Sequence, residues 1–121
     1  EKLAHVAPPF ENVPYLMNNL FEYLKSKDEL TLIKSCVFHY EMEFIHPFID
    51  GNGRTSRLVM NLILLQHGYV IANIKGDYDT RMRYYQTLES AQTQNNKEDF
   101  ILFVAQIEKE SLERYLAIIG Q

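Results

Sequence analysis

The chain has 121 residues, of which 46% are hydrophobic and 23% charged, and its formal net charge is −4. This length fits one domain, residues 1–121, with a core of its own and no room for a second domain. The negative charge argues against a nucleic-acid-binding protein, because such proteins usually carry a basic excess.

The single cysteine, Cys36, excludes an internal disulfide framework. It lies on an apolar helical stripe, so we expect a buried thiol in a reducing, cytoplasmic environment. No apolar run approaches the roughly 18 residues that a membrane-spanning helix needs, so we expect no membrane partner. The chain begins with Glu1 rather than Met, so upstream features cannot be judged from it.

The apolar spacing is helical nearly throughout and predicts an all-α fold. Residues 1–10, with Pro8 and Pro9, are expected to be extended, with at most a short N-terminal β-hairpin. Residues 13–24 predict the first helix, and Pro14 suits its first turn.

A second apolar stripe, residues 33–44, runs straight into a loop at His46. Pro47 should end this helix, because the residue before a proline is pushed out of the helical region. We therefore expect His46 in an extended conformation. Residues 54–67 are apolar nearly all round, which is typical of a buried central helix, and Gly68 can close that helix in a left-handed conformation.

Two more helices are predicted. The first covers residues 78–94, is expected to bury Met82, Tyr85 and Leu88, and ends where Asn95-Asn96 breaks the pattern. The last begins near Phe100 and continues beyond Leu112.

The most informative segment, residues 46–57, reads HPFIDGNGRTSR. Its turn of Gly51, Asn52 and Gly53 opens directly onto the predicted central helix. Glycines permit close backbone approach, and free N–H groups at a helix start form an anion site. Arg54 and Arg57 are three residues apart and should project to the same side of the helix, where their guanidinium groups can bind phosphates.

A carboxylate and an imidazole precede this anion site. Asp50 offers a hard oxygen ligand, and one carboxylate together with substrate phosphates commonly holds Mg²⁺. His46 stands where it could take a proton from an incoming hydroxyl. Each residue singly also has a structural explanation, as a turn, a cap or a packed histidine. Together, at this spacing, they indicate a polyphosphate site with a general base.

These twelve residues resemble the signature of the Fic family, H-x-F-x-D/E-G-N-G-R-x-x-R, at every specified position. The likeness extends over essentially the whole chain, to positions before and after the motif: Pro8, Pro9, Val13, Pro14, His39, Tyr40, Asn61, Gly68, Tyr84 and Tyr85. The resemblance implies a Fic fold, a compact helical bundle around a buried central helix, with residues 1–10 forming or following a substrate-clamping flap.

The resemblance also implies an activity: transfer of AMP from ATP to a Ser, Thr or Tyr hydroxyl of a target protein or of the chain itself, with release of pyrophosphate. It implies that His46 is the general base and that Asp50 binds Mg²⁺ on the nucleotide. The anion hole would be formed by Gly51, Asn52 and Gly53, with Arg54 and Arg57 on the phosphates. Phe48 would be buried and would anchor the loop. Tyr84 and Tyr85 would lie near the nucleoside, one ring facing the core and the other the pocket, in an order left open.

The chain departs from the family pattern in two ways, which concern the nucleotide donor and the inhibitory helix. Gln92 stands where relatives often carry Asn near the nucleoside, so UTP, GTP or a phosphocholine carrier is an alternative donor. Gly53 argues against the kinase branch, which has Lys there.

Some relatives carry an inhibitory helix, S/T-x-x-x-E-G/N, whose Glu pairs with the second motif arginine. No glutamate of this chain follows Ser or Thr by four residues. Such a helix would lie upstream of Glu1, come from a partner chain, or be absent.

Two alternatives of other classes remain. A non-catalytic nucleotide-binding or antitoxin-partnered module would not need the intact His46 and loop. A metal site at His39 and His46, two helical turns apart, lacks the further ligands that a zinc set requires.

Overall fold

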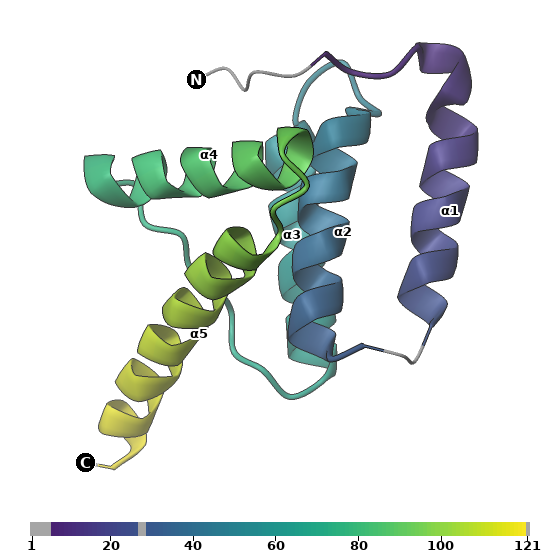
Figure 1. Cartoon of the computed structure of the whole chain (residues 1–121). Helices are drawn as coiled ribbons and strands as arrows, with labels where there is room; N and C mark the ends of the chain where they lie inside the picture. Colours follow the sequence, from purple (N-terminus) through teal and green to yellow (C-terminus); the bar gives the residue numbers. More distant parts are fainter. Residues whose placement is uncertain (1–5, 27–28, 121) are drawn as a thin grey trace.

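The computed structural model describes residues 6–26 and 29–120 (Figure 1). It contains a 3₁₀ turn and five α-helices: η1 (Phe10–Asn12), α1 (Val13–Lys25), α2 (Thr31–Ile45), α3 (Asn52–Gln66), α4 (Tyr78–Thr93) and α5 (Glu98–Ile119). The described ranges contain no strand, which confirms the all-α prediction. Residues 6–9 form no part of a hairpin, and the rest of the expected hairpin, residues 1–5, lies outside the described residues.

Local sequence signals mark the helix ends where they were predicted. Pro14 occupies the first turn of α1, where its missing N–H costs no hydrogen bond. Gly68 has φ +86° and follows α3, and the Tyr69 N–H reaches back to the Leu64 carbonyl at 3.0 Å. This left-handed closure satisfies a carbonyl at the helix end. Asn95, with φ +53°, ends the α4 segment in the same conformation.

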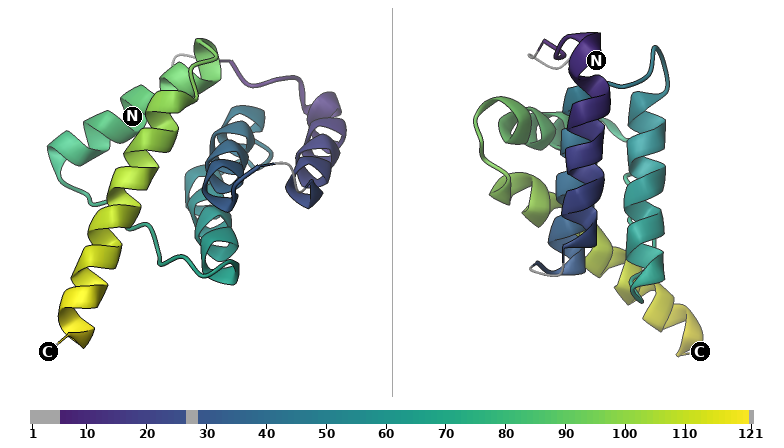
Figure 2. Two further views of the ribbon diagram at one scale, coloured as in Figure 1. Left: turned by 60° about the horizontal axis from the view of Figure 1, so that its bottom comes forward. Right: turned by 90° about the vertical axis from the view of Figure 1, so that its right-hand side faces the viewer.

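The central helix is α2, not α3. Figures 1 and 2 show α1 on one side of α2 and α3 running antiparallel beside α2. Helices α4 and α5 lie on the side of α2 that faces away from α1. The buried side chains of α2 point in several directions: Ser35, Cys36, Phe38, His39, Tyr40, Met42 and Ile45. The prediction of a fully buried α3 is wrong, because Leu58, Leu62 and Leu65 are exposed on one stripe. An apolar composition shows that a helix can be buried, but its neighbours decide which faces are covered.

Two apolar clusters lie on opposite sides of α2. The smaller one joins α2 to α1 through Leu20, Phe38, Met42 and Ile45. The larger one joins α2 to α3, α4 and α5, and Phe100 and Leu88 are among its fully buried residues. No helix within the described residues is long and apolar enough to cross a membrane.

The link between α3 and α4 is fixed by side chains that bind its backbone. The Asn61 amide accepts from the Ala72 N–H at 2.8 Å and donates to the Ala72 carbonyl at 3.4 Å. The Glu108 carboxylate accepts from the Val70 N–H at 2.8 Å. These bonds tie the link to α3 and α5. They thereby help to hold α4 where Tyr84 meets α2 and α3.

Candidate active site

The loop between α2 and α3 begins at His46, which caps α2 in a left-handed conformation. Its φ and ψ are 56° and 59°, and its N–H donates to the Met42 carbonyl at 2.9 Å. The expected extended conformation is therefore wrong. The helix closes with a left-handed residue, a common way to end an α-helix, and Pro47 begins the loop only after this closure. The result is an exposed imidazole at the end of a packed helix.

The Asn52 side chain stabilises the loop by hydrogen bonds to the loop backbone. Its side-chain oxygen accepts from the Phe48 N–H at 2.9 Å, and its amide group donates to the Phe48 carbonyl at 2.8 Å. Asn52 is buried, so its side chain is committed to the loop and its backbone N–H is what remains for an anion. The Phe48 ring is 48% exposed, so the expectation that it is buried is wrong. The Phe48 backbone, rather than its ring, anchors the loop.

The first turn of α3 leaves its N–H groups free for an anion. Gly51 is the N-cap with φ +81°, a conformation that favours glycine. Its carbonyl accepts the first helical bond, from the Thr55 N–H at 2.9 Å. The N–H groups of Asn52, Gly53 and Arg54 precede that bond and have no intrahelical acceptor. They point out of the helix start, where the helix dipole also favours negative charge.

The two arginines of this turn have different partners. Arg54 lies over the loop, with Nη2 4.0 Å from Asp50 Oδ2, and the same nitrogen would be 2.9 Å from a Cβ at Gly51. Arg57 turns toward α4 and donates through Nη1 to Tyr84 Oη at 3.2 Å. A Cβ at Gly53 would lie 3.1 Å from Arg57 Nη1. The absent side chains of the two glycines therefore leave room for both guanidinium groups.

Glu43, in the last turn of α2, also borders the first turn of α3. Its Oε2 would be 3.0 Å from a Cβ at Gly53, the same point that Arg57 approaches. This carboxylate was not predicted from the motif, because it precedes the signature. Its place one turn before His46, at the end of the same helix, is the signal that points to it.

The two neighbouring tyrosines of α4 have different surroundings. Tyr84 is the inward residue, 3% exposed, and its hydroxyl lies 2.8 Å from His39 Nε2. Tyr85 is half-buried, with its ring 5.1 Å from that of Tyr84. Tyr85 packs against the edge of the larger apolar cluster and is only partly buried, whereas the fully buried stripe of α4 is Tyr84, Leu88 and Ala91. Gln92 donates to the Tyr40 carbonyl of α2 at 3.2 Å.

His39 is a buried neutral histidine rather than a metal ligand. Burial lowers the pKa of His39 to about 3, and its ring stacks on Phe100 with centroids 5.4 Å apart. Within residues 6–26 and 29–120, no three His, Cys, Asp or Glu groups gather where they could hold a metal ion. Cys36 is likewise buried, and burial raises the pKa of its thiol to about 12.

We expect the buried His39 to make the folded chain less stable in mild acid. The unfolded chain binds a proton at His39 below its ordinary pKa of 6.5, whereas the folded chain does so only near 3. Between these values stability falls as the pH falls. The free energy of unfolding should drop by about 1 kcal/mol between pH 7 and pH 5.5 from this group. Urea unfolding at both pH values measures it. His67→Gln, at an exposed histidine, should show the same drop as the parent. His39→Phe should not show it. Equal drops in both variants would contradict the assignment of the pH dependence to His39.

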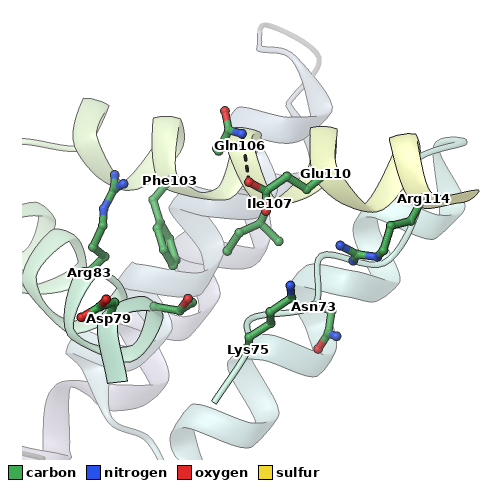
Figure 3. A pocket seen from close by; sticks show the side chains of 10 residues that line it. Asn73, Lys75, Asp79, Arg83, Phe103, Gln106, Ile107, Glu110 and Arg114 are labelled. Carbon is green, nitrogen blue, oxygen red and sulfur yellow. Dashed lines mark hydrogen bonds between the residues drawn. The ribbon is translucent and has the colours of Figure 1, made fainter. Parts of the chain in front are cut away.

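A separate cavity lies away from the loop, between the α3–α4 link, α4 and α5 (Figure 3). Its volume is about 160 Å³, and Lys75, Arg83 and Arg114 reach it from the three segments. It shares no residue with the segment 46–57.

The sequence model of the Fic/DOC family matches residues 1–64, which is 64 of the 121 residues and includes the whole loop. The chain belongs to the Fic/DOC family. This Fic/DOC domain is also similar over most of its length to curated proteins. It is 38% identical over 116 residues to Protein adenylyltransferase Fic of Nematostella vectensis, covering 93% of this chain and 26% of that protein. It is 36% identical to the protein of the same name from Aedes aegypti, covering 93% and 23%. The chain thus spans about a quarter of the length of these relatives.

Solved structures confirm the fold of this Fic/DOC domain. A fragment of Fic-1 from C. elegans superposes with a TM-score of 0.86 at 27% identity, covering 99% of this chain and 36% of that one. A Fic family protein from Desulfovibrio desulfuricans G20 superposes with a TM-score of 0.82 at 38% identity, covering 100% and 38%.

Proposed function

We propose that this Fic/DOC domain transfers AMP from ATP to a Ser, Thr or Tyr hydroxyl of a protein and releases pyrophosphate. The observation that carries the proposal is the exposed His46 at the end of α2, in the short loop that leads to the free N–H groups at the start of α3. The relatives from Nematostella vectensis and Aedes aegypti are named protein adenylyltransferases, which supports the same chemistry.

In the proposed reaction His46 accepts the proton of the target hydroxyl. The hydroxyl oxygen forms a bond to the α-phosphorus of ATP, and the bond from that phosphorus to the bridging oxygen breaks. Pyrophosphate leaves with the bonding electrons. Arg54, Arg57 and the free N–H groups of α3 neutralise the phosphates as charge develops. An inhibitory helix, from upstream or from a partner chain, would act by placing a glutamate against Arg57 in competition with a phosphate.

Mg²⁺ is the expected cofactor, and Asp50 fits it. The Asp50 side chain is 89% exposed beside the anion site. Its Oδ1 accepts from the Gly51 N–H at 2.8 Å, which orients the carboxylate. One carboxylate combined with substrate phosphates and water is a common way to hold Mg²⁺ in a protein. Bound there, the ion would neutralise phosphate charge and orient the nucleotide.

Asp50→Ala should remove the Mg²⁺ dependence together with transfer. Loss of an outer-shell partner of a metal costs about 10–100-fold, so loss of the carboxylate ligand should cost at least about 100-fold. Titration of Mg²⁺ against AMP transfer measures both effects. Asp79→Ala, at an exposed aspartate of α4, is the matched control and should behave like the parent. An unchanged Mg²⁺ response in Asp50→Ala would place the metal elsewhere.

The proposed activity is tested with ATP labelled at two different phosphates. Label on the α-phosphate should appear on the chain itself or on proteins of a lysate, and label on the γ-phosphate should not. Transfer of the γ-label would indicate a kinase, and transfer of neither would contradict the proposal. Competition by unlabelled UTP and GTP tests the alternative donors left open by Gln92.

A further inference from the structure

A chain of polar groups runs from the partly buried Arg57 at the start of α3 into the core. Tyr84 stands between Arg57, whose Nη1 is 3.2 Å from its hydroxyl, and His39, whose Nε2 is 2.8 Å from the same hydroxyl. The three residues come from three helices, α4, α3 and α2. Tyr84 and His39 are both buried, so their contact is shielded from water.

The direction of the Arg57–Tyr84 hydrogen bond follows from the groups involved, and that of the Tyr84–His39 bond follows from the tautomer of His39. A guanidinium has donors only, so the Tyr84 oxygen must accept from Arg57. The Tyr84 hydroxyl proton is then available for His39, which accepts it through Nε2 when the imidazole carries its proton on Nδ1. Burial lowers the pKa of His39 to about 3, so the imidazole is neutral and able to accept.

Aromatic packing fixes this chain in place. His39 stacks on Phe100, and the Tyr84 ring packs against Phe100 and Phe103 with centroids 6.4 and 6.2 Å away. The Arg57 guanidinium also lies over the Tyr84 ring, 5.9 Å from its centroid. A free arginine side chain loses much rotamer entropy when it binds a ligand. An arginine that is already held by a fixed hydroxyl loses less, so its affinity for phosphate is higher.

We propose that Tyr84 and His39 are positioning residues, which hold the Arg57 guanidinium at the first turn of α3 in the orientation that binds phosphate. The inference rests on the proposed function in that Arg57 is taken to bind the nucleotide's phosphates. It assigns the Tyr84 hydroxyl to Arg57 rather than to the nucleoside.

The test uses inorganic triphosphate, which contains no nucleoside, as the ligand in calorimetric titrations of the whole chain. Tyr84→Phe removes only the hydroxyl and should weaken triphosphate binding about tenfold, the effect expected for a lost charge-assisted hydrogen bond. Tyr40→Phe is the matched control. Tyr40 is buried in the same apolar cluster and its ring also meets Phe100, edge-on. The Tyr40→Phe variant should bind triphosphate with the same affinity as the parent.

A double-mutant cycle separates positioning from general packing. In an Arg57→Ala background, Tyr84→Phe should cause no further loss of affinity, because the hydroxyl acts through Arg57. His39→Phe keeps the ring stacking but removes the acceptor, and should weaken binding in the same direction as Tyr84→Phe. Circular dichroism of each variant checks that it is folded.

Several outcomes would overturn the inference. These are parent-like affinity in Tyr84→Phe, an equal loss with and without Arg57, or a parent chain that does not bind triphosphate. A chain that binds triphosphate through Arg57 and Tyr84 but transfers no AMP would contradict the proposed function and leave the inference standing.

Discussion

Replacing His46 with alanine should reduce AMP transfer by about 10²–10⁴-fold, the usual cost of losing a general base. ATP binding should persist, because the phosphates are expected to contact Arg54, Arg57 and the start of α3, none of which involves the imidazole. His46 is exposed at the end of α2, so its side chain is available to a substrate hydroxyl. Transfer from α-labelled ATP and calorimetric ATP binding measure the two effects separately.

The left-handed conformation of His46 calls for a second variant. Alanine is disfavoured at positive φ, and His46→Ala could weaken the cap of α2 as well as remove the base. His46→Asn tolerates that conformation and should lose transfer just as fully. His67→Ala, at an exposed histidine at the end of α3, should transfer at the parent rate. Parent-like transfer by His46→Asn would remove His46 from the chemistry.

Phe100→Ala should destabilise the chain by about 3–5 kcal/mol, the range for removing a fully buried aromatic ring. Phe100 has no exposed surface, and its ring is surrounded by four others, those of His39, Tyr40, Tyr84 and Phe103. The substitution leaves a cavity where α2, α4 and α5 meet. The loss is a large share of the 5–15 kcal/mol that typically separates folded from unfolded states. Urea unfolding followed by circular dichroism measures it.

The matched control for the core is Phe10→Ala. Phe10 begins η1 and is 80% exposed, so its loss should change stability by no more than about 0.5 kcal/mol. A loss below about 1 kcal/mol in Phe100→Ala would mean that the aromatic cluster can close around the missing ring, and that it does not hold the site rigidly.

The sequence by itself determined the helices and predicted the chemistry of the loop. Pro14, Gly68 and Asn95 act through their own backbone preferences, so their effect on helix ends is local and readable. The motif is local in the same way. Its twelve consecutive residues form one loop and the start of one helix, so no distant contact is needed to bring the imidazole, the carboxylate and the free N–H groups of the helix start together.

Only the tertiary structure decided which faces are covered and which side chains hold the arginines. Periodicity indicates that α3 has apolar residues all round, but α2 lies in the middle and the outer leucines of α3 are exposed. The Tyr84 hydroxyl contacts Arg57, which is 27 positions away in the sequence, and His39, which is 45 positions away. Such contacts depend on how α4 crosses α2 and α3. That crossing results from packing among several helices at once, which no local pattern of residues specifies.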